Sequence, residues 1–204
     1  MSENKAYHHG DLRSALIDAA RKLIGEKGPR AISLREVAKA AGVSHAAPYR
    51  HFKDKDELLA SIAELGFRRL ADRLEEITAQ VENTREQLLE SGKAYVRLAL
   101  AAPEITLLMF GGYVLIGEPN PELQRSADRA YQGLIRVIEN GIATGLYIEK
   151  SSSDLAMAVW SLVHGFSLLA IGNHVPTELI DDTQNVDTLS QQLCEMLLQG
   201  IARQ

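Results

Sequence analysis

The sequence predicts an all-α protein of about nine helices. Apolar residues recur at intervals of three and four along most of the chain, and no alternating strand pattern stands out. Capping residues, glycines and prolines divide these periodic segments into lengths that are typical of globular helices. With 204 residues, 46% of them hydrophobic and 24% charged, the chain can bury a core without disulfides.

The first helix is predicted after Asp11, a good N-cap residue, and before Gly28 and Pro29, which stop it. Its apolar stripe consists of Leu12, Ala15, Leu16, Ala19, Leu23 and Ile24. A short second helix is predicted after Ser33, because Ser33 and Glu36 have the spacing of a capping box. The buried face of this helix is expected to be Leu34, Val37, Ala38 and Ala41.

A third helix is expected after the break at Gly42, capped by Ser44 and ending near Phe52. Pro48 lies inside it and has no N–H, so the first closing hydrogen bond is lost. A residue that precedes proline is pushed away from α geometry, so Ala47 is expected to strain or delay the first turn. The predicted helix is therefore barely two turns long, and its residues are mostly exposed.

A long fourth helix is predicted from the Asp54-x-x-Glu57 cap to about Gln80. Further helices are predicted at 84–101, 103–110, 120–145, 154–171 and 187–202, between breaks at glycine, proline and serine residues.

The stretch from Leu155 to Asn173 has no charged residue and is nearly long enough to span a bilayer. Acidic residues flank it and His164 lies within it, which favours a helix buried between protein layers and no membrane contact. The first ten residues lack the apolar core of a secretory signal, and the single Cys194 cannot form an internal disulfide. These features favour a cytoplasmic protein.

Charge is unevenly distributed along the chain. Residues 1–55 contain eleven Lys and Arg against six Asp and Glu, a net charge of +5, whereas residues 56–204 carry −10. Such asymmetry indicates a basic segment that faces a polyanion, although chance surface composition also explains it.

The second and third predicted helices, at about 33–52, have the spacing of a helix-turn-helix whose second member enters the DNA major groove. A plain helical hairpin would give the same periodicity. Polar Ser44 and His45 and small Ala46 and Ala47 begin the third helix, where a core helix would carry large apolar residues. A helix that begins in this way can approach base edges closely.

Donor side chains crowd the seven positions that follow Pro48, with Asp54 as the only acid. They are Tyr49, Arg50, His51, Lys53 and Lys55. Lys55 is expected at the first position of the fourth helix, where the helix dipole disfavours a cation and a bound phosphate would remove the conflict. Contacts of this kind give salt-dependent affinity for DNA.

Residues 11–64, from "DLRSALIDAARKLIG" to "HFKDKDELLASIAE", resemble the DNA-binding domain of TetR-type transcriptional regulators. The resemblance implies that Arg35, Tyr49, His51 and Lys55 contact phosphates and that His45 and Ala47 face bases. The predicted DNA-contact set is Arg35, Ser44, His45, Ala47, Tyr49, Arg50, His51, Lys53 and Lys55. Pro48 departs from the Leu, Ile or Phe that is usual in the family, and His51 can also be read as a cation at a helix end.

The second half resembles a TetR subgroup named for Trp, His and Gly, here Trp160, His164 and Gly165, and the segment "PEITLLMFGGYVL" at 103–115 also resembles it. The resemblance implies a one-component regulator with a DNA-binding domain at 8–68 and an effector-binding, dimer-forming domain at 69–204. The candidate effector pocket is Met109, Phe110, Tyr113, Trp160 and His164, with core packing as the open alternative for Trp160 and His164.

The last two helices are expected to form a homodimer interface. One side of the first carries Ala158, Ser161, Gly165 and Leu168, and the second carries an apolar stripe of Leu189, Leu193, Met196, Leu197 and Ile201. A two-fold dimer predicts binding to an inverted-repeat operator in double-stranded DNA.

The predicted function is a DNA-binding transcriptional repressor that a small-molecule effector releases from its operator. The alternatives are a helical enzyme and a sequence-indifferent DNA-binding protein. No catalytic motif or metal-ligand spacing is present and no cofactor is expected, while a net charge of −5 fits poorly with DNA packaging.

Overall fold

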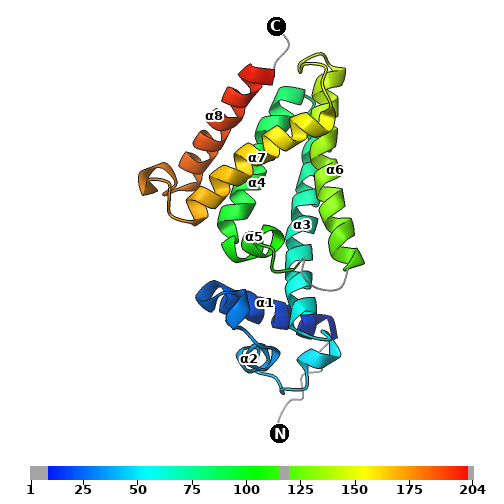
Figure 1. Cartoon of the computed structure of the whole chain (residues 1–204), viewed down its shortest axis with the longest axis vertical. Coiled ribbons are helices and arrows are strands. Elements are labelled where there is room, and N and C mark those ends of the chain that lie inside the picture. The colour runs from blue at the N-terminus through cyan, green and yellow to red at the C-terminus, as the bar shows by residue number, and fades with distance from the viewer. Residues whose placement is uncertain (1–8, 115–119, 202–204) are drawn as a thin grey trace. The chain divides into compact units, whose positions relative to one another are not determined.

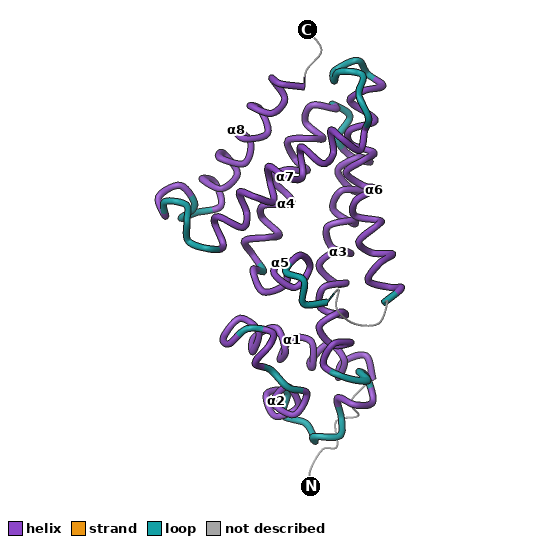
Figure 2. The backbone as a smooth tube through the Cα atoms, viewed as in Figure 1, coloured by secondary structure: helices purple, strands orange, loops and turns teal. Residues whose placement is uncertain are grey.

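The computed structural model describes residues 9–114 and 120–201, and this part of the chain contains eight α-helices and no β-strand (Figures 1 and 2). The prediction of an all-α fold is confirmed. Predictions that concern residues 1–8, residue 115 and residues 202–204 lie outside the described residues.

The chain separates into two compact units. The first unit comprises the residues up to Gly66 together with Glu104–Leu123, and the second comprises Phe67–Pro103 and the residues from Gln124 onward. Helix α3 (Lys55–Gln80) contributes residues to both units.

The first unit contains α1 (His9–Lys27), α2 (Leu34–Ala40), the beginning of α3 and most of α5 (Pro103–Phe110), with the 3-10 helices η1 (Pro29–Ala31) and η2 (Pro48–Arg50). Its fully buried side chains include Leu16, Val37, Phe52, Leu58 and Ile62. The prediction that Asp11 caps the first helix is wrong, because the helix already includes His9 and Gly10. Its end before Gly28 agrees with the expectation. The predicted apolar stripe is confirmed in part, because Leu16, Ala19 and Ile24 are buried whereas the other three residues are half-buried and Ala20 was missed.

Helix α5 packs within the first unit. The Arg21 guanidinium donates two hydrogen bonds to Glu104 Oε1, at 3.1 and 2.9 Å, and both side chains are partly buried. Gly66 of α3 lies so close to α5 that an added Cβ would be 2.4 Å from Met109 Sδ. The first unit is therefore built from the amino-terminal helices and a segment that follows them by about 40 residues in sequence.

The second unit contains the remainder of α3, α4 (Thr84–Ala101), most of α6 (Pro121–Ala143), α7 (Ser152–Ile171), η3 (Thr177–Leu179) and α8 (Thr183–Ile201). Helix α4 packs against both α7 and α8, and the three lie together in Figure 1. Helix α7 begins two residues earlier than predicted because Ser151 Oγ accepts the Asp154 N–H. Helix α8 begins four residues earlier than predicted, and Asp182 Oδ1 accepts the Asn185 N–H in its first turn.

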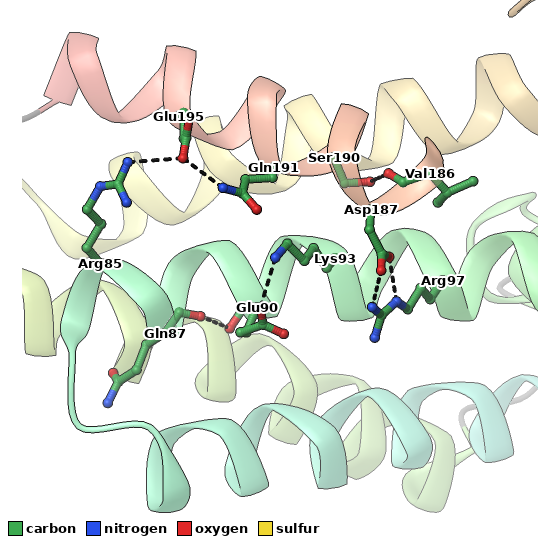
Figure 3. Close-up of polar contacts among 11 residues, drawn as sticks. Arg85, Gln87, Glu90, Lys93, Arg97, Val186, Asp187, Ser190, Gln191 and Glu195 are labelled. Atoms are coloured by element: carbon green, nitrogen blue, oxygen red, sulfur yellow. Dashed lines mark hydrogen bonds and ion pairs between the residues drawn. The ribbon is translucent and has the colours of Figure 1, made fainter. Parts of the chain in front are cut away.

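Ion pairs align α4 with α8 along an exposed edge (Figure 3). Arg85 Nη2 lies 3.1 Å from Glu195 Oε1, and Arg97 Nε lies 2.6 Å from Asp187 Oδ1. The pair Arg85–Glu195 joins the start of α4 to the second half of α8, and the pair Arg97–Asp187 joins the end of α4 to the start of α8. The two helices are therefore antiparallel. The hydrogen bond from Arg97 lowers the pKa of Asp187. Solvent screens exposed pairs of this kind, so they select the register of α8 more than they stabilise the fold.

Helix α7 is the only helix among the described residues that is long and apolar enough to cross a membrane. One third of its apolar window is buried, and its buried residues include Ala156, Val159 and Val163. The expectation of a helix enclosed between protein layers therefore holds for one face only. The outward face carries Met157, Leu168 and Leu169, which are 48%, 38% and 52% exposed.

Candidate nucleic-acid interface

The predicted helix-turn-helix begins with the capped helix α2. Ser33 Oγ accepts the Glu36 N–H at 3.3 Å and donates to Glu36 Oε2 at 2.7 Å, so the predicted pairing of these two residues is confirmed. A hydrogen bond from Lys27 and then one from Ser33 lower the pKa of Glu36. After α2 the chain turns at Gly42, whose φ of +70° favours glycine, and the Val43 N–H donates to Ala38 O.

The predicted third α-helix is absent. Residues 45–47 form a turn and Pro48–Arg50 form the 3-10 helix η2. The Ala47 N–H donates to Ser44 O at 3.0 Å, and the Arg50 N–H donates to Ala47 O at 3.2 Å, which are bonds between residues three apart. Pro48 has no N–H with which to reach Ser44 O, so the tighter pattern replaces the α-helical one.

Ala47 does not leave the α region, contrary to the expectation for a residue before proline: its φ is −63° and its ψ is −44°. The effect of the proline is confined to the hydrogen-bond pattern. Pro48 itself is buried, as is Phe52, which is 1% exposed. Pro48 thus takes the place of a core side chain and turns the remainder of the segment outward.

Four predicted DNA contacts lie on the exposed side of this segment. They are Ser44, His45, Tyr49 and Arg50, and Tyr49 is 55% exposed although its ring is largely apolar. Ala47 is half-buried. Hydroxyl, imidazole, phenol and guanidinium groups can all donate to phosphate or to base acceptors. The segment is thus a polar, donor-rich surface held by a buried proline and phenylalanine.

The remaining predicted contacts lie on the flanks. Arg35 is exposed on α2, Lys53 is exposed before α3, and His51 is half-buried with its ring 6.4 Å from that of Phe52. The guanidinium of Arg13, which the sequence analysis did not single out, lies 5.3 Å from the Phe52 ring centre and donates to Ser61 Oγ. This cation–π contact between Arg13 and the face of the Phe52 ring stabilises the buried position of Phe52.

Lys55 is the first residue of α3, as predicted, and its ammonium donates to Arg30 O at 3.2 Å. The helix start is also capped by acids: the Glu57 N–H donates to Asp54 Oδ1 at 2.9 Å, and the Lys53 N–H donates to Glu57 Oε2 at 2.6 Å. These carboxylates already offset the helix dipole, so the expected conflict between Lys55 and the dipole is weaker than the sequence indicated. Lys55 has a structural partner in η1, and its contact with phosphate stays a prediction.

The predicted effector-pocket residues fall in both units. Trp160 and His164 lie in the second unit, with ring centres 5.9 Å apart. Met109, Phe110 and Tyr113 lie in the first unit, where the Arg30 guanidinium is 5.5 Å from the Tyr113 ring centre. The five-residue pocket stays a prediction.

Two residues that the sequence analysis missed accompany Trp160 and His164. Tyr95 of α4 places its hydroxyl oxygen 2.7 Å from His164 Nδ1 and 3.4 Å from Trp160 Nε1. Tyr131 of α6 stacks obliquely against Trp160 at 6.4 Å between ring centres. The available signal was the spacing of four residues between Gln87, Ser91 and Tyr95, an uncharged polar stripe on α4.

The predicted dimer surface is only partly exposed, because Gly165, Leu189, Leu193 and Leu197 are half-buried. Ala158, Ser161 and Leu168 are exposed on α7, and Met196 is 69% exposed on α8. Ile201 does not belong to this surface, because it is buried and its carbonyl accepts the Ile148 N–H.

Comparison with known proteins gives two family matches. Residues 16–62 match the model of bacterial regulatory proteins of the tetR family, and residues 88–197 match a tetracyclin repressor-like C-terminal domain. The Trp-His-Gly subgroup is not confirmed by these matches.

Individual relatives cover nearly the whole chain. The fatty acid metabolism regulator protein of Bacillus subtilis (strain 168) is 24% identical over 196 residues, which is 91% of this chain and 93% of that protein. The structure of a protein with unknown function from Rhodococcus sp. RHA1 is 30% identical with a TM-score of 0.80, covering 98% of this chain and all of the other.

The transcriptional regulator FadR from Bacillus subtilis, in complex with stearoyl-CoA, is 20% identical with a TM-score of 0.72. The match covers 92% of this chain and 98% of that one. At this identity the likeness shows the fold alone.

Proposed function

The chain belongs to the TetR family of bacterial regulatory proteins and is a DNA-binding transcriptional regulator, and we propose that it is a homodimeric repressor released by a small-molecule effector. The proposed division of labour is a DNA-binding domain at 8–68 and an effector-binding, dimer-forming domain at 69–204. A regulator that reads bacterial DNA works in the cytoplasm, where we place this protein.

The observation that carries the proposal is the segment from Ser44 to Arg50, which exposes hydrogen-bond donor side chains. Buried Pro48 and Phe52 anchor this segment to the core of the first unit. We assign base contacts to His45 and Ala47. Phosphate contacts are assigned to Arg35, Ser44, Tyr49, Arg50, His51, Lys53 and Lys55. A 3-10 segment is shorter and tighter than the α-helix of the usual helix-turn-helix, so only its few outward side chains reach the groove.

Selection from random DNA duplexes at one fixed salt concentration tests this assignment. We expect an enriched inverted repeat, and we expect His45→Ala to relax the preference at one or two positions in each half-site, with a cost of about 1–3 kcal/mol at the preferred base. If no sequence is enriched, the protein is a sequence-indifferent DNA binder. If the preference of the His45→Ala variant is unchanged, the reading surface lies elsewhere.

The homodimer is proposed to form through α7 and α8. Met157, Leu169 and Met196 are large apolar side chains that these two helices leave exposed, and exposed apolar surface is what a partner helix would cover. Gly165 and Ser161 allow close approach of a partner helix. Two copies related by a two-fold axis would present two reading segments to an inverted repeat.

A fatty acyl thioester is proposed as the effector. The proposal is supported by the relative that regulates fatty acid metabolism and by the neighbour that was solved with stearoyl-CoA. Effector binding is proposed to favour a dimer whose reading segments are wrongly spaced for DNA, with α3, which contributes to both units, as the mechanical link. A coupling of about 1–3 kcal/mol would change operator affinity by about 5- to 150-fold.

A helical enzyme is the second candidate of a different class. The tetR family model and the relative from Bacillus subtilis are regulators, which supports the first reading. Turnover of an acyl thioester that disappears in a His164→Gln variant would favour the enzyme instead.

A further inference from the structure

Helix α4 carries an uncharged polar stripe into the interior of the second unit. Gln87, Ser91 and Tyr95 follow one another at intervals of four and are 4%, 3% and 7% exposed. Burial of polar groups costs free energy unless they are hydrogen-bonded, and apolar residues of similar shape would serve stability equally well. A buried stripe of this kind is therefore a candidate for a role besides packing.

The two ends of the stripe have different surroundings. At one end the Gln87 amide is occupied by protein groups: its Nε2 donates to Val81 O at 2.7 Å, and Asn140 Nδ2 donates to its Oε1 at 2.9 Å. At the other end Tyr95 meets half-buried rings from two other helices, Trp160 and His164 of α7, with Tyr131 of α6 against Trp160. Tyr95, Tyr131, Trp160 and His164 are called the Tyr95 cluster below.

Counting donors and acceptors assigns the protons of the cluster. The Trp160 indole can only donate, so its N–H points to the Tyr95 oxygen. The Tyr95 oxygen lies 2.7 Å from His164 Nδ1, and because a phenol is a stronger donor than a neutral imidazole we infer that the Tyr95 hydroxyl donates and that the imidazole proton lies on Nε2. Burial raises the pKa of Tyr95 to about 12 and lowers the pKa of His164, so both groups are neutral at pH 7.

No charged side chain is buried among the described residues of the second unit, whose buried polar side chains include Gln87, Ser91, Ser167 and Ser190. A charged group that reached Tyr95 would lose part of its hydration, and the four side chains of the cluster are themselves neutral hydrogen-bonding or aromatic groups. An apolar chain or ring would gain aromatic contact area instead, and a neutral acceptor oxygen could join the hydrogen-bond chain.

We propose that the Tyr95 cluster binds the uncharged part of the effector, an apolar chain that carries a thioester, ester or similar neutral carbonyl group, and that it discriminates against a carboxylate at the same position. This proposal rests on the proposed function, which supplies the effector-binding role of the second unit. It replaces Met109, Phe110 and Tyr113 by Tyr95 and Tyr131 as the partners of Trp160 and His164.

Trp160 is the only tryptophan of the chain, so its fluorescence reports on the cluster directly. The full-length protein is titrated with stearoyl-CoA, with stearate at pH 8 and with coenzyme A alone. We expect stearoyl-CoA to change the Trp160 emission and to bind at least about tenfold more tightly than stearate, because the side chains of the cluster themselves supply no cation for a desolvated carboxylate. Coenzyme A alone should leave the emission unchanged.

Tyr95→Phe removes the central hydroxyl and keeps the ring. We expect it to weaken stearoyl-CoA binding by about three- to tenfold, the range for one net hydrogen bond. Tyr147→Phe is the matched control, because Tyr147 is also fully buried in the second unit and its hydroxyl donates to Thr84 O outside the cluster. Its stearoyl-CoA affinity should equal that of the wild type.

The proposal is overturned if stearate binds as tightly as stearoyl-CoA, if Tyr95→Phe leaves the affinity unchanged, or if no acyl probe alters the Trp160 emission. Operator binding by the same preparations separates this result from the proposed function. A protein that binds its inverted repeat, or is released from it by stearoyl-CoA without any change at Trp160, remains a regulator whose effector site lies elsewhere.

Discussion

Replacing Lys55 by methionine isolates one phosphate contact, because two effects on folding are expected to cancel. Lys55→Met removes the hydrogen bond from the ammonium to Arg30 O, which costs about 0.5–1.5 kcal/mol. It also removes a cation from the first turn of α3, which stabilises the helix by at most about 1 kcal/mol because the carboxylates of Asp54 and Glu57 already offset part of the dipole. The aliphatic stem is retained, so the free energy of unfolding should change by less than about 1 kcal/mol.

The effect on DNA binding should be larger and should depend on salt. Each phosphate contact contributes about 0.9 to the slope of log K against log salt, so the loss of one contact from each of two subunits reduces the slope by about 1.8. Between about 50 and about 200 mM salt, the wild-type affinity should therefore fall about twelvefold more than that of the variant.

Fluorescence anisotropy with a labelled inverted repeat from the selection measures both slopes. Lys150→Met, which removes an exposed cation from the second unit, is the control for a change in net charge alone and should leave the slope as in the wild type. A Lys55→Met variant with the wild-type slope would refute the phosphate contact and would leave Lys55 with its structural role at η1.

Four further substitutions test the packing of the fold, the half-buried His164 and the dimer. Gly141→Ala should lower the free energy of unfolding in urea by about 1–3 kcal/mol, because its Cβ would lie 2.0 Å from a ring atom of Tyr147, whereas Gly200→Ala, with nothing within 4 Å, should raise it by up to about 1 kcal/mol. If both substitutions changed the free energy of unfolding equally, the close packing of Gly141 against Tyr147 would be contradicted. Burial lowers the pKa of His164, so near pH 6.5 the unfolded chain takes up a proton that the folded chain does not. The free energy of unfolding should therefore fall as the pH drops below 6.5. In urea titrations, His164→Gln should make the free energy of unfolding less dependent on pH. If the free energy of unfolding of the variant depended on pH as strongly as that of the wild type, His164 would not be the cause of the pH dependence. A Cβ added at Gly165 would meet no atom of its own chain within 4 Å, so a leucine there should disturb only a partner helix. We expect Gly165→Leu to raise the dimer dissociation constant, measured by sedimentation equilibrium, at least about tenfold. An unchanged constant would place the dimer interface elsewhere.

The helix boundaries were predictable where local hydrogen-bond chemistry sets them. Gly28, Ser33 with Glu36, and Asp54 with Glu57 act within one turn of the helices that they limit, and the predictions at these points are confirmed. Asp11 failed as a cap because the helix continues upstream, where the sequence contains no apolar repeat to reveal it.

The segment after Gly42 was harder to predict because two local preferences compete. Ser44 as a cap and Phe52 as an apolar anchor both favour an α-helix, while Pro48 removes one bond and crowds another. The 3-10 pattern satisfies the Ser44 carbonyl through Ala47 and still buries Pro48. A single hydrogen bond decides between the two geometries, and periodicity cannot detect it.

Contacts between distant segments were beyond sequence reasoning. Arg21 and Glu104 are 83 positions apart, and Tyr95 and His164 are 69 apart, so no spacing rule connects them. The placement of α5 in the first unit follows from the former contact and from the packing of Met109 on Gly66. The same lack of long-range information explains why Tyr113 was grouped with Trp160 although it stacks under Arg30.

Hydroxyl-radical footprinting of the protein on a selected duplex tests the central claim most directly, namely that two copies read an inverted repeat through the segment around Ser44–Arg50. At about 0.1 M salt, two protected blocks should appear on one face of the duplex, with centres about 10 base pairs or a multiple of one helical turn apart. His45→Ala should weaken both blocks equally. Uniform protection along the duplex, or a single block that His45→Ala leaves intact, would contradict the account.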